Sequence, residues 1–203
     1  MIGIAEINKI YLASKSPRRK ELLQLMGLEF EILYIDIPEE IKQNESFREY
    51  SVRICNEKAN FAWNYLVNNK LPLYPVLTAD TEVIFEDTVL GKPLDYDDAF
   101  RMWKMYSGKS NLVITSISLK YEDFQKTLIN ESMVYFDEVS DRDIHKYLKM
   151  GDYKDKSGGY GIQSYAGQFI KRIEGCFFSV MGMPLNGVKQ LLQELYRQKS
   201  VQK

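Results

Sequence analysis

Short stretches in which apolar and polar residues alternate recur along the chain, and each of them predicts a β-strand. Two such stretches flank the polar sequence YEDFQK and predict a β-hairpin, and a shorter hairpin is predicted around Glu86 and Asp87. The stretch before Asp80 is mostly apolar, which is typical of a buried strand. The predicted strands are Lys9–Ser14, Phe30–Ile37, Pro75–Ala79, the hairpin Glu82–Leu90, Leu112–Tyr121, Thr127–Phe136, and the pair Phe169–Ile173 and Cys176–Met181 around Glu174 and Gly175.

Capping residues and helical spacing predict the helices that lie between these strands. Ser16 stands at an N-cap position, with Pro17 first in the helix and Gly27 at its end. Ser46 and Glu49 form a capping box before a long helix. The residues of that helix that recur at helical spacing, and that predict one core face, are Phe47, Tyr50, Ile54, Phe61 and Tyr65. Further helices are predicted at Asp95–Tyr106, at Ser140–Met150 and from Pro184 onward.

The order of these elements indicates the fold class. Strands and helices interleave, but hairpins lie among them, so we expect an α/β fold with a mixed sheet flanked by helices rather than a purely parallel sheet. A chain of 203 residues that is 45% hydrophobic and 27% charged is typical of a globular protein that needs no disulfide or metal to fold. We find no internal repeat and no linker, and therefore expect one domain over residues 1–203.

Charge and apolar runs argue against several classes of protein. The 27 basic and 28 acidic residues give a net charge of −1, whereas nucleic-acid-binding proteins usually carry a basic excess, so no stable nucleic-acid partner is expected. No apolar run approaches the ~20 residues that a membrane-spanning helix needs. The first residues lack a basic region followed by a long apolar stretch, so we expect no secretory signal.

Two cysteines and one histidine limit the chemistry. Cys55 and Cys176 lie far apart and form no CxxC motif, so we expect two free thiols in a reducing cytoplasm. His145 stands alone, which excludes a multi-histidine zinc site and an HExxH protease. Its polar, helical surroundings argue against a Ser-His-Asp triad. The remaining metal ligands are the oxygens of Asp and Glu, which suit Mg²⁺ or Mn²⁺.

A basic cluster follows the first predicted strand. Lys15, Arg18, Arg19 and Lys20 lie within six residues, where a strand passes into the N-terminus of a helix. Backbone N–H groups and the helix dipole favour an anion there, and arginine matches phosphate oxygens. The cluster is therefore either a polyphosphate cradle or a capping serine followed by a solvated basic face, and spacing alone does not separate the two.

Other acidic and basic residues have a structural and a chemical interpretation each. Asp80 lies where α/β sheets usually bind ligands, and could bind a cation, orient an attacking water or simply end a strand. Lys92 in its GKP turn could pair with phosphate or lie on the surface. Glu39 and Glu40 could bind a metal or belong to a solvated loop, and Lys58 in the long helix could form an exposed ion pair.

A glycine-rich segment, SGGYGIQ, leads to the amide of Gln163. Glycines permit close approach of the backbone to a ligand, and an amide can donate to and accept from the edge of a base. The alternative is an ordinary mobile loop.

Six motifs occur in order between Leu12 and Leu185: LASKSPRRKELLQLMG, NEKANFA, TADTEV, LGKP, DKSGGYGIQ and FFSVMGMPL. They resemble, in the same order, the motifs LASxSPRRxELL, EKA, GADTxV, GKP, DKAGAYGIQ and VxGLPL of the Maf (septum-formation) family of nucleoside triphosphate pyrophosphatases. The resemblance covers most of the chain. It favours phosphate binding by the basic cluster.

The resemblance implies a fold and an activity. The implied fold is an elongated mixed α/β structure like that of inosine triphosphate pyrophosphatases, with two lobes around a central cleft. The implied reaction cleaves a nucleoside triphosphate to the monophosphate and pyrophosphate with a divalent cation, Mg²⁺ or Mn²⁺, and a homodimer is the family's expectation. The residues implied are Asp80 as the catalytic acid and metal ligand, Glu39 as metal ligand with Glu40 as its alternative, Lys58, Lys92, Ser14 and Arg19.

The resemblance also implies a base preference. Arg18, Thr81 and Gln163 match the arginine, threonine and glutamine of the branch that prefers dTTP and UTP. A sister branch acting on 7-methyl-GTP has a bulky aromatic residue, a glutamine and a glutamate there. This chain departs from the family pattern at Glu82, which replaces an apolar residue, and in the sequences SGG and QSY, which replace AGA and QGx. These departures bear on substrate preference and remove no catalytic residue.

Two other interpretations remain. One is a non-enzymatic nucleic-acid-binding or cell-division-associated protein that grips phosphate with the SPRRK sequence. The other is the same chemistry on non-canonical purine or methylated nucleotides.

Overall fold

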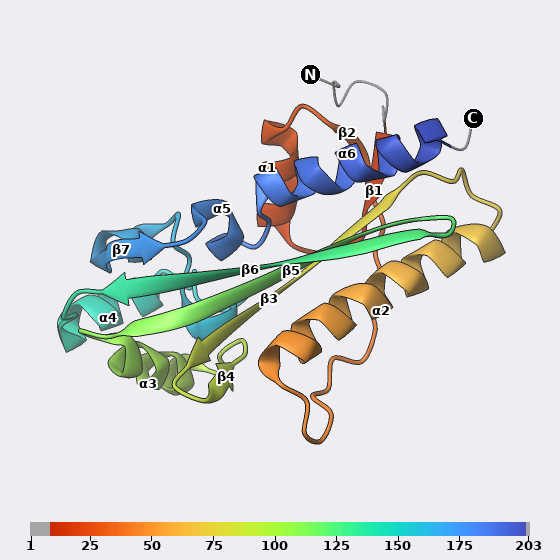
Figure 1. Cartoon of the computed structure of the whole chain (residues 1–203). Coiled ribbons are helices and arrows are strands. Elements are labelled where there is room, and N and C mark those ends of the chain that lie inside the picture. Colours follow the sequence, from red (N-terminus) through yellow and green to blue (C-terminus); the bar gives the residue numbers. More distant parts are fainter. Residues whose placement is uncertain (1–8, 202–203) are drawn as a thin grey trace. The chain divides into compact units, whose positions relative to one another are not determined.

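The computed structural model describes residues 9–201, which form two compact units (Figure 1). Unit 1 comprises the chain up to Asp80, Ser116–Ile129, and the chain from Gly182. Unit 2 comprises Thr81–Thr115 and Asn130–Met181. Three strands contribute residues to both units: β3 (Val76–Phe85), β5 (Ser110–Tyr121) and β6 (Phe124–Phe136). The single domain with two lobes around a cleft stays a prediction.

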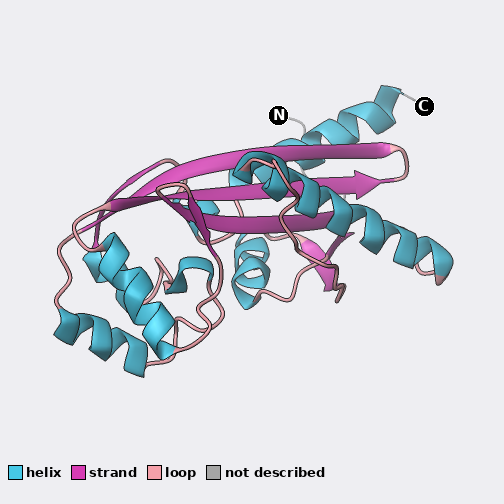
Figure 2. Cartoon of the chain, turned by 90° about the horizontal axis from the view of Figure 1, so that it is seen from below, coloured by secondary structure: helices cyan, strands magenta, loops and turns pink. Residues whose placement is uncertain are grey.

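Seven strands form one mixed sheet, which confirms the α/β class with helices beside a mixed sheet (Figure 2). The strand order is β2-β1-β3-β5-β6-β7, with β4 paired to β3. Strand β1 pairs in parallel with β2 and with β3, whereas β4 pairs antiparallel with β3, and β7 with β6. The remaining strand bounds are Lys9–Leu12 for β1, Glu29–Ile32 for β2, Thr88–Leu90 for β4 and Ile170–Glu174 for β7.

Unit 1 contains helices α1 (Pro17–Leu25), α2 (Phe47–Asn68) and α6 (Leu185–Val201). The capping box predicted for α2 is confirmed: the Ser46 hydroxyl accepts from the Glu49 N–H at 3.3 Å, and the Glu49 carboxylate accepts from the Ser46 N–H at 2.9 Å. These bonds satisfy N–H groups that the first helical turn leaves unpaired. The start of α2 is therefore fixed by two adjacent side chains.

The core face predicted for α2 is wrong in its second half. Phe61 and Tyr65 are 48% and 44% exposed. The fully buried positions there are instead small or further round the helix, at Ala59, Ala62 and Leu66. Small side chains at this face let the helix lie close to the core, so the aromatic residues at its margin remain in solvent.

Unit 2 packs helices α3 (Tyr96–Tyr106) and α4 (Asp141–Lys149) around the fully buried Trp103. The indole N–H of Trp103 donates to the Gly159 carbonyl at 3.1 Å, and the Tyr106 hydroxyl donates to the Gly158 carbonyl at 2.8 Å. Gly158 has φ +71°, and a Cβ there would lie 2.9 Å from the Tyr106 hydroxyl and from Val83. The glycines of SGGYGIQ are thus needed for the backbone to lie against the core.

Several boundaries differ from those predicted. The segment Cys176–Met181 is not a strand but contains the short helix α5 (Phe177–Val180), and β7 pairs with β6 instead. Gly175 has φ +131°, a conformation in which the chain leaves the sheet. The second strand ends at Ile32 rather than Ile37, and the third strand, β3, continues through Asp80 to Phe85. Asp80 therefore does not end a strand.

The loop after Lys149 forms two 3₁₀ turns, η2 (Ser157–Gly159) and η3 (Tyr165–Phe169). Within residues 9–201, no helix has both the length and the apolar character needed to cross a membrane.

Candidate active site

Two carboxylates meet one ammonium group in unit 1. Lys58 on α2 places Nζ 2.7 Å from Asp80 Oδ1 on β3 and 2.8 Å from Glu39 Oε1 in the loop after β2. The side chains of Asp80 and Lys58 are only 5% and 13% exposed, whereas Glu39 is 46% exposed. Three residues distant in the sequence are thus brought together, as the family resemblance implied for Asp80, Glu39 and Lys58.

Burial and two nearby carboxylates act in opposite directions on the pKa of Lys58. Burial alone would lower the pKa of its ammonium group, but the charges of Asp80 and Glu39 and the hydrogen bonds to them raise that pKa above its ordinary value. Lys58 is therefore a permanent cation at neutral pH. It holds both carboxylates next to one positive charge.

The second oxygen of Asp80 has no partner among the described residues. Asp80 Oδ2 is fully buried and accepts no hydrogen bond there. A buried carboxylate oxygen without a donor is costly unless another group binds it. Asp80 Oδ2 is therefore a buried acceptor that a cation or a water molecule could bind.

The pair of carboxylates fits a hard divalent cation. Among residues 9–201, no group of three or more His, Cys, Asp or Glu side chains could hold a metal. Mg²⁺, however, is usually held by one or two carboxylates together with phosphate oxygens of the substrate. The unpartnered Asp80 Oδ2 and the half-exposed carboxylate of Glu39 supply that minimum.

Arg19 of the basic cluster contacts a serine hydroxyl. Ser14, after β1, is buried, and its Oγ accepts from the Ser16 N–H at 3.2 Å and from Arg19 Nη1 at 3.3 Å. Arg19 Nε also donates to the carbonyl of Gly182 at 3.1 Å. Ser16 occupies the N-cap position of α1 as predicted, although its side chain makes no capping bond. Arg18 on the same helix is partly exposed.

Burial and the nearby acids act in opposite directions on Arg19. Burial lowers the pKa of its guanidinium, and the charges of Asp80 and Glu39 partly restore it. An arginine stays protonated throughout the physiological range. Arg19 is therefore a positive charge that interacts electrostatically with Asp80 and Glu39.

Buried polar side chains of β3, α2 and β5 also contact one another in unit 1. Thr78 on β3 donates from its hydroxyl to the Cys55 carbonyl at 2.9 Å, and the Cys55 thiol lies 3.3 Å from that hydroxyl. On the next turn of α2, Ser51 donates to the Ser116 hydroxyl at 2.8 Å. Burial raises the pKa of the Cys55 thiol to about 12, so Cys55 is not a nucleophile.

The other sequence-predicted site residues belong to unit 2. The Thr81 hydroxyl lies 3.1 Å from that of Thr115, and Lys92 and Gln163 are exposed. The N–H of Gly158 donates to the carbonyl of Gly91 at 2.9 Å. This bond joins the GKP turn that carries Lys92 to the glycine-rich segment that leads to Gln163.

A buried ion pair near Gln163 was not among the residues singled out in the sequence. Lys156 is 6% exposed, and its ammonium binds Asp152 and Asp155 at 2.8 and 2.9 Å. Ser164, directly after Gln163, donates to Asp152 Oδ2 at 2.5 Å and lies 2.8 Å from the Gly161 carbonyl. The lysine of the DKSGGYGIQ motif was the signal that could have pointed to this network.

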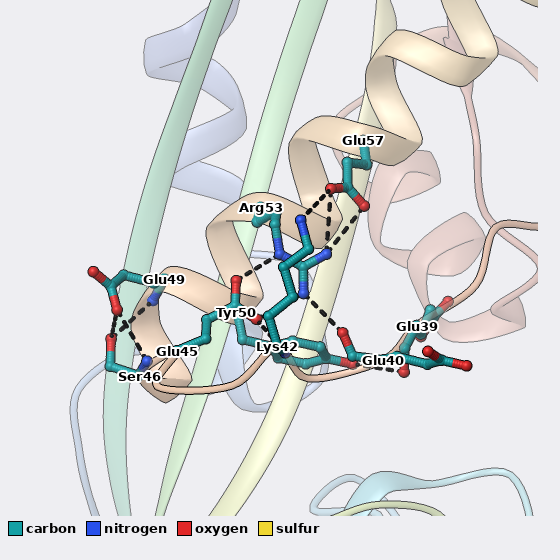
Figure 3. Close-up of polar contacts among 9 residues, drawn as sticks. All are labelled: Glu39, Glu40, Lys42, Glu45, Ser46, Glu49, Tyr50, Arg53 and Glu57. Carbon is teal, nitrogen blue, oxygen red and sulfur yellow. Dashed lines mark hydrogen bonds and ion pairs between the residues drawn. The ribbon is translucent and has the colours of Figure 1, made fainter.

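The second set of missed residues lies beside Glu39. Arg53 and Tyr50 on α2 bind the backbone of the loop that carries Glu39 (Figure 3). In the sequence, Arg53 and Glu57 are an i, i+4 pair, which is typical of an exposed helix face and gave no signal of a site.

Fold and site together define a class of protein: an α/β protein whose candidate site pairs two carboxylates with one buried ammonium group. Comparison with known proteins gives the family. The family model described as "Maf-like protein" matches residues 9–195. The chain belongs to the Maf family.

Curated relatives cover nearly the whole chain. The dTTP/UTP pyrophosphatase of Chromobacterium violaceum is 42% identical over 188 residues, covering 92% of this chain and 94% of that protein. The dTTP/UTP pyrophosphatase of Photobacterium profundum is 39% identical over 179 residues, covering 87% and 91%. Among solved structures, the Staphylococcus aureus Ham1 protein aligns with a TM-score of 0.48 and 11% identity over 94% of this chain and 99% of that one.

Proposed function

We propose that this chain hydrolyses nucleoside triphosphates, with dTTP and UTP preferred, to the nucleoside monophosphate and pyrophosphate. The observation that carries the proposal is the buried, unpartnered Oδ2 of Asp80 beside the Lys58 ammonium. Membership of the Maf family and the relatives called dTTP/UTP pyrophosphatases support the substrate class.

Asp80 is the proposed base. Its Oδ2 accepts a proton from a water molecule whose oxygen attacks the α-phosphorus. The new bond joins that oxygen to the α-phosphorus, and the bond from the α-phosphorus to the α–β bridging oxygen breaks, so that pyrophosphate leaves. Lys58, bound to Oδ1 at 2.7 Å, holds the carboxylate in place.

The cations bind the polyphosphate. Arg19 with Ser14 at the start of α1, Lys58 and Lys92 are the proposed contacts to phosphate oxygens. Positioning and neutralisation of charge supply most of the rate in reactions of this kind, because little covalent work falls to the protein. A divalent ion held by Asp80 and Glu39, Mg²⁺ or Mn²⁺, would add neutralisation of the phosphate charge.

Base selection is assigned to Arg18, Thr81 and Gln163, which match the dTTP and UTP branch. Gln163 is exposed at the end of the glycine-rich segment and can both donate and accept. Glu82 is 8% exposed and so adds no charge to an open surface next to Asp80. Ser164 ties the segment to Asp152, where the family pattern has glycine.

The test is pyrophosphate release from a panel of nucleoside triphosphates with Mg²⁺ or Mn²⁺, for the wild type and for Asp80→Asn. We expect strongest release from dTTP and UTP, and a loss of roughly 10²-fold or more in kcat for the variant with its folding retained. The matched control is Asp141→Asn, at an exposed ion pair in unit 2. A variant with near-normal kcat would remove Asp80 from the mechanism.

Other outcomes of the same panel separate the rival functions. Release that is strongest from non-canonical purine or methylated nucleotides would keep Asp80 and overturn the roles of Arg18, Thr81 and Gln163. No turnover of any nucleotide, with salt-sensitive RNA binding, would favour a binding protein.

The proposal includes a cytoplasmic location and a homodimer. Cys55 and Cys176 are both free thiols, which supports a reducing, cytoplasmic compartment. A homodimer is the family's expectation, and size-exclusion chromatography with light scattering tests it.

A further inference from the structure

Arg53 uses every N–H group of its guanidinium. Nε and Nη2 donate to the two oxygens of Glu45 at 2.5 and 2.7 Å, and Nη1 donates to both oxygens of Glu57 at 3.2 and 3.1 Å. The remaining Nη2 donor binds the carbonyl of Glu40 at 2.8 Å. Figure 3 shows the guanidinium between helix α2 and the loop that precedes it. A side chain with all donors used holds one position.

The loop that carries Glu39 has no helix or strand of its own to order it. Residues 33–45 form neither, so their backbone depends on side chains for fixed hydrogen bonds. The Tyr50 hydroxyl donates to the Glu39 carbonyl at 3.3 Å, one residue before the carbonyl that Arg53 binds. Glu45 in turn accepts from the Lys42 N–H at 3.0 Å. Two consecutive carbonyls of the loop are therefore tied to one helix.

The same helix holds the other end of Glu39. Its carboxylate binds Lys58, which lies on α2 beyond Arg53. Backbone and side chain of Glu39 are thus both fixed relative to α2. Rotation of the loop would carry the carboxylate away from Lys58 and from Asp80.

Charge explains why the residue at this position is arginine. Glu45 and Glu57 would repel each other without a cation between them, and the side chain of Glu45 is only 9% exposed. The planar fork of arginine binds Glu45 through Nε and Nη2, Glu57 through Nη1, and the Glu40 carbonyl as well. Lysine has a single ammonium point charge and three donors, so it cannot make this set of bonds.

We propose that Arg53 is a positioning residue that holds the Glu39 carboxylate where it shares a divalent cation with Asp80, and so sets the affinity of the site for that cation. The inference rests on the proposed role of Glu39 as metal ligand. Arg53 acts through the loop backbone and touches neither the cation nor the nucleotide.

The first measurement is the Kd for Mn²⁺ alone, from the electron paramagnetic resonance signal of the free ion. The variants are Arg53→Lys, Glu39→Gln and the double variant, with Arg101→Lys as the control. Arg101 pairs with Asp98 on α3 and is 59% exposed. We expect Arg53→Lys to raise the Kd by ~10-fold or more, as loss of a partner behind a metal ligand does. In the Glu39→Gln background the same substitution should change it little.

The second measurement reports the loop without metal. Hydrogen–deuterium exchange of residues 36–45 in the metal-free protein should be faster in Arg53→Lys than in the wild type, while exchange in α3 is unchanged. Thermal unfolding of each variant checks that the fold is intact. If Arg53→Lys does not fold, Tyr50→Phe removes only the hydroxyl bound to the Glu39 carbonyl and should shift the Kd in the same direction.

The possible results distinguish a failure of the positioning role of Arg53 from a failure of the metal role of Glu39. A folded Arg53→Lys with wild-type Mn²⁺ affinity overturns the inference, and so does an equal rise in Kd in the Glu39→Gln background. A wild-type Kd in Glu39→Gln itself, or no Mn²⁺ binding by the wild type, refutes the metal role of Glu39 and the inference with it. Asp80→Asn kinetics test the remaining chemistry independently.

Discussion

Lys58 and Asp80 lie 22 residues apart in the sequence, yet their charged groups are 2.7 Å apart and both side chains are largely buried. One stands on a helix and the other within a strand, so regular elements on both sides fix the distance. Buried ion pairs add little net stability, but removal of one partner leaves the other charge unpaired. A buried pair of this kind is what the proposed chemistry requires, and its net contribution to stability is expected to be small.

Replacement of Lys58 tests this directly. Lys58→Met should lower stability by about 3 kcal/mol, because Asp80 is left as a buried charge without its cation. It should also lower kcat/KM for UTP by roughly 10²-fold. Urea unfolding and steady-state kinetics measure the two effects.

The control is Lys104→Met, because Lys104 forms an ion pair with Asp141 in which both side chains are more than half exposed. Such pairs contribute about 0–1 kcal/mol. Equal losses of stability in the two variants would contradict the special position of Lys58.

Gln163 should determine the choice of base. Gln163→Glu removes the amide donor and adds a negative charge, so kcat/KM for UTP should fall roughly tenfold relative to that for other triphosphates, about the effect of one lost hydrogen bond. Gln168→Glu, five residues on, is the control, since its amide donates only to the Tyr165 carbonyl. An unchanged ranking of nucleotides in Gln163→Glu would count against base recognition by this residue.

Glu45 should make stability depend on acidity. The hydrogen bonds from Arg53, opposed by burial and aided by the Lys42 N–H, lower the pKa of Glu45 to about 2. An unfolded glutamate titrates near ~4.3. The contribution of the charged form is thus complete above that value and is lost as pH falls toward 2, because the unfolded chain takes up the proton first.

The measurement is urea unfolding of the wild type and Glu45→Gln at several pH values. Their difference in stability should be constant from pH 7 to 5 and shrink between about pH 4.5 and 2.5. Glu29→Gln is the control, because Glu29 is 70% exposed and 3.8 Å from Lys9. A difference that is as large at pH 2.5 as at pH 6 would contradict this assignment.

The two thiols should differ in reactivity. Cys55 is fully buried with a raised pKa, whereas Cys176 is partly exposed. Iodoacetamide at pH 8 should therefore add one label to the native protein and two in urea, counted by intact mass. Peptide mapping should place the native label on Cys176, and labelling of Cys55 at a similar rate would mean that α2 opens readily.

Local signals predicted most of the fold. The capping box at Ser46 involves atoms within a few residues, so a short window of sequence contains its cause. Family motifs singled out Asp80, Glu39 and Lys58, which the structure brings together, although they lie far apart in the sequence; their role as a site stays a prediction.

What the sequence did not predict depends on tertiary surroundings. The aromatic pair Phe177 and Phe178 favours a strand locally, but β6 already pairs with β7, and the chain turns into α5 after Gly175. The contact of Arg53 with the Glu39 loop could not be predicted, for a similar reason. Its bond to the Glu40 carbonyl depends on how the loop folds back on α2, which no local pattern reports.

Helix α2 sets the spacing between the residues that contact the Glu39 loop and Lys58. It carries Tyr50, Arg53 and Lys58 at fixed intervals. The capping box at Ser46 fixes the residue at which the helix begins. Each inserted residue would turn everything beyond it by about 100°. An insertion between Arg53 and Lys58 would thus change the orientation of Lys58 relative to Tyr50 and Arg53, whereas one after Leu66 would leave all three in register. Insertion scanning of α2 should therefore find its least tolerant stretch between Arg53 and Lys58.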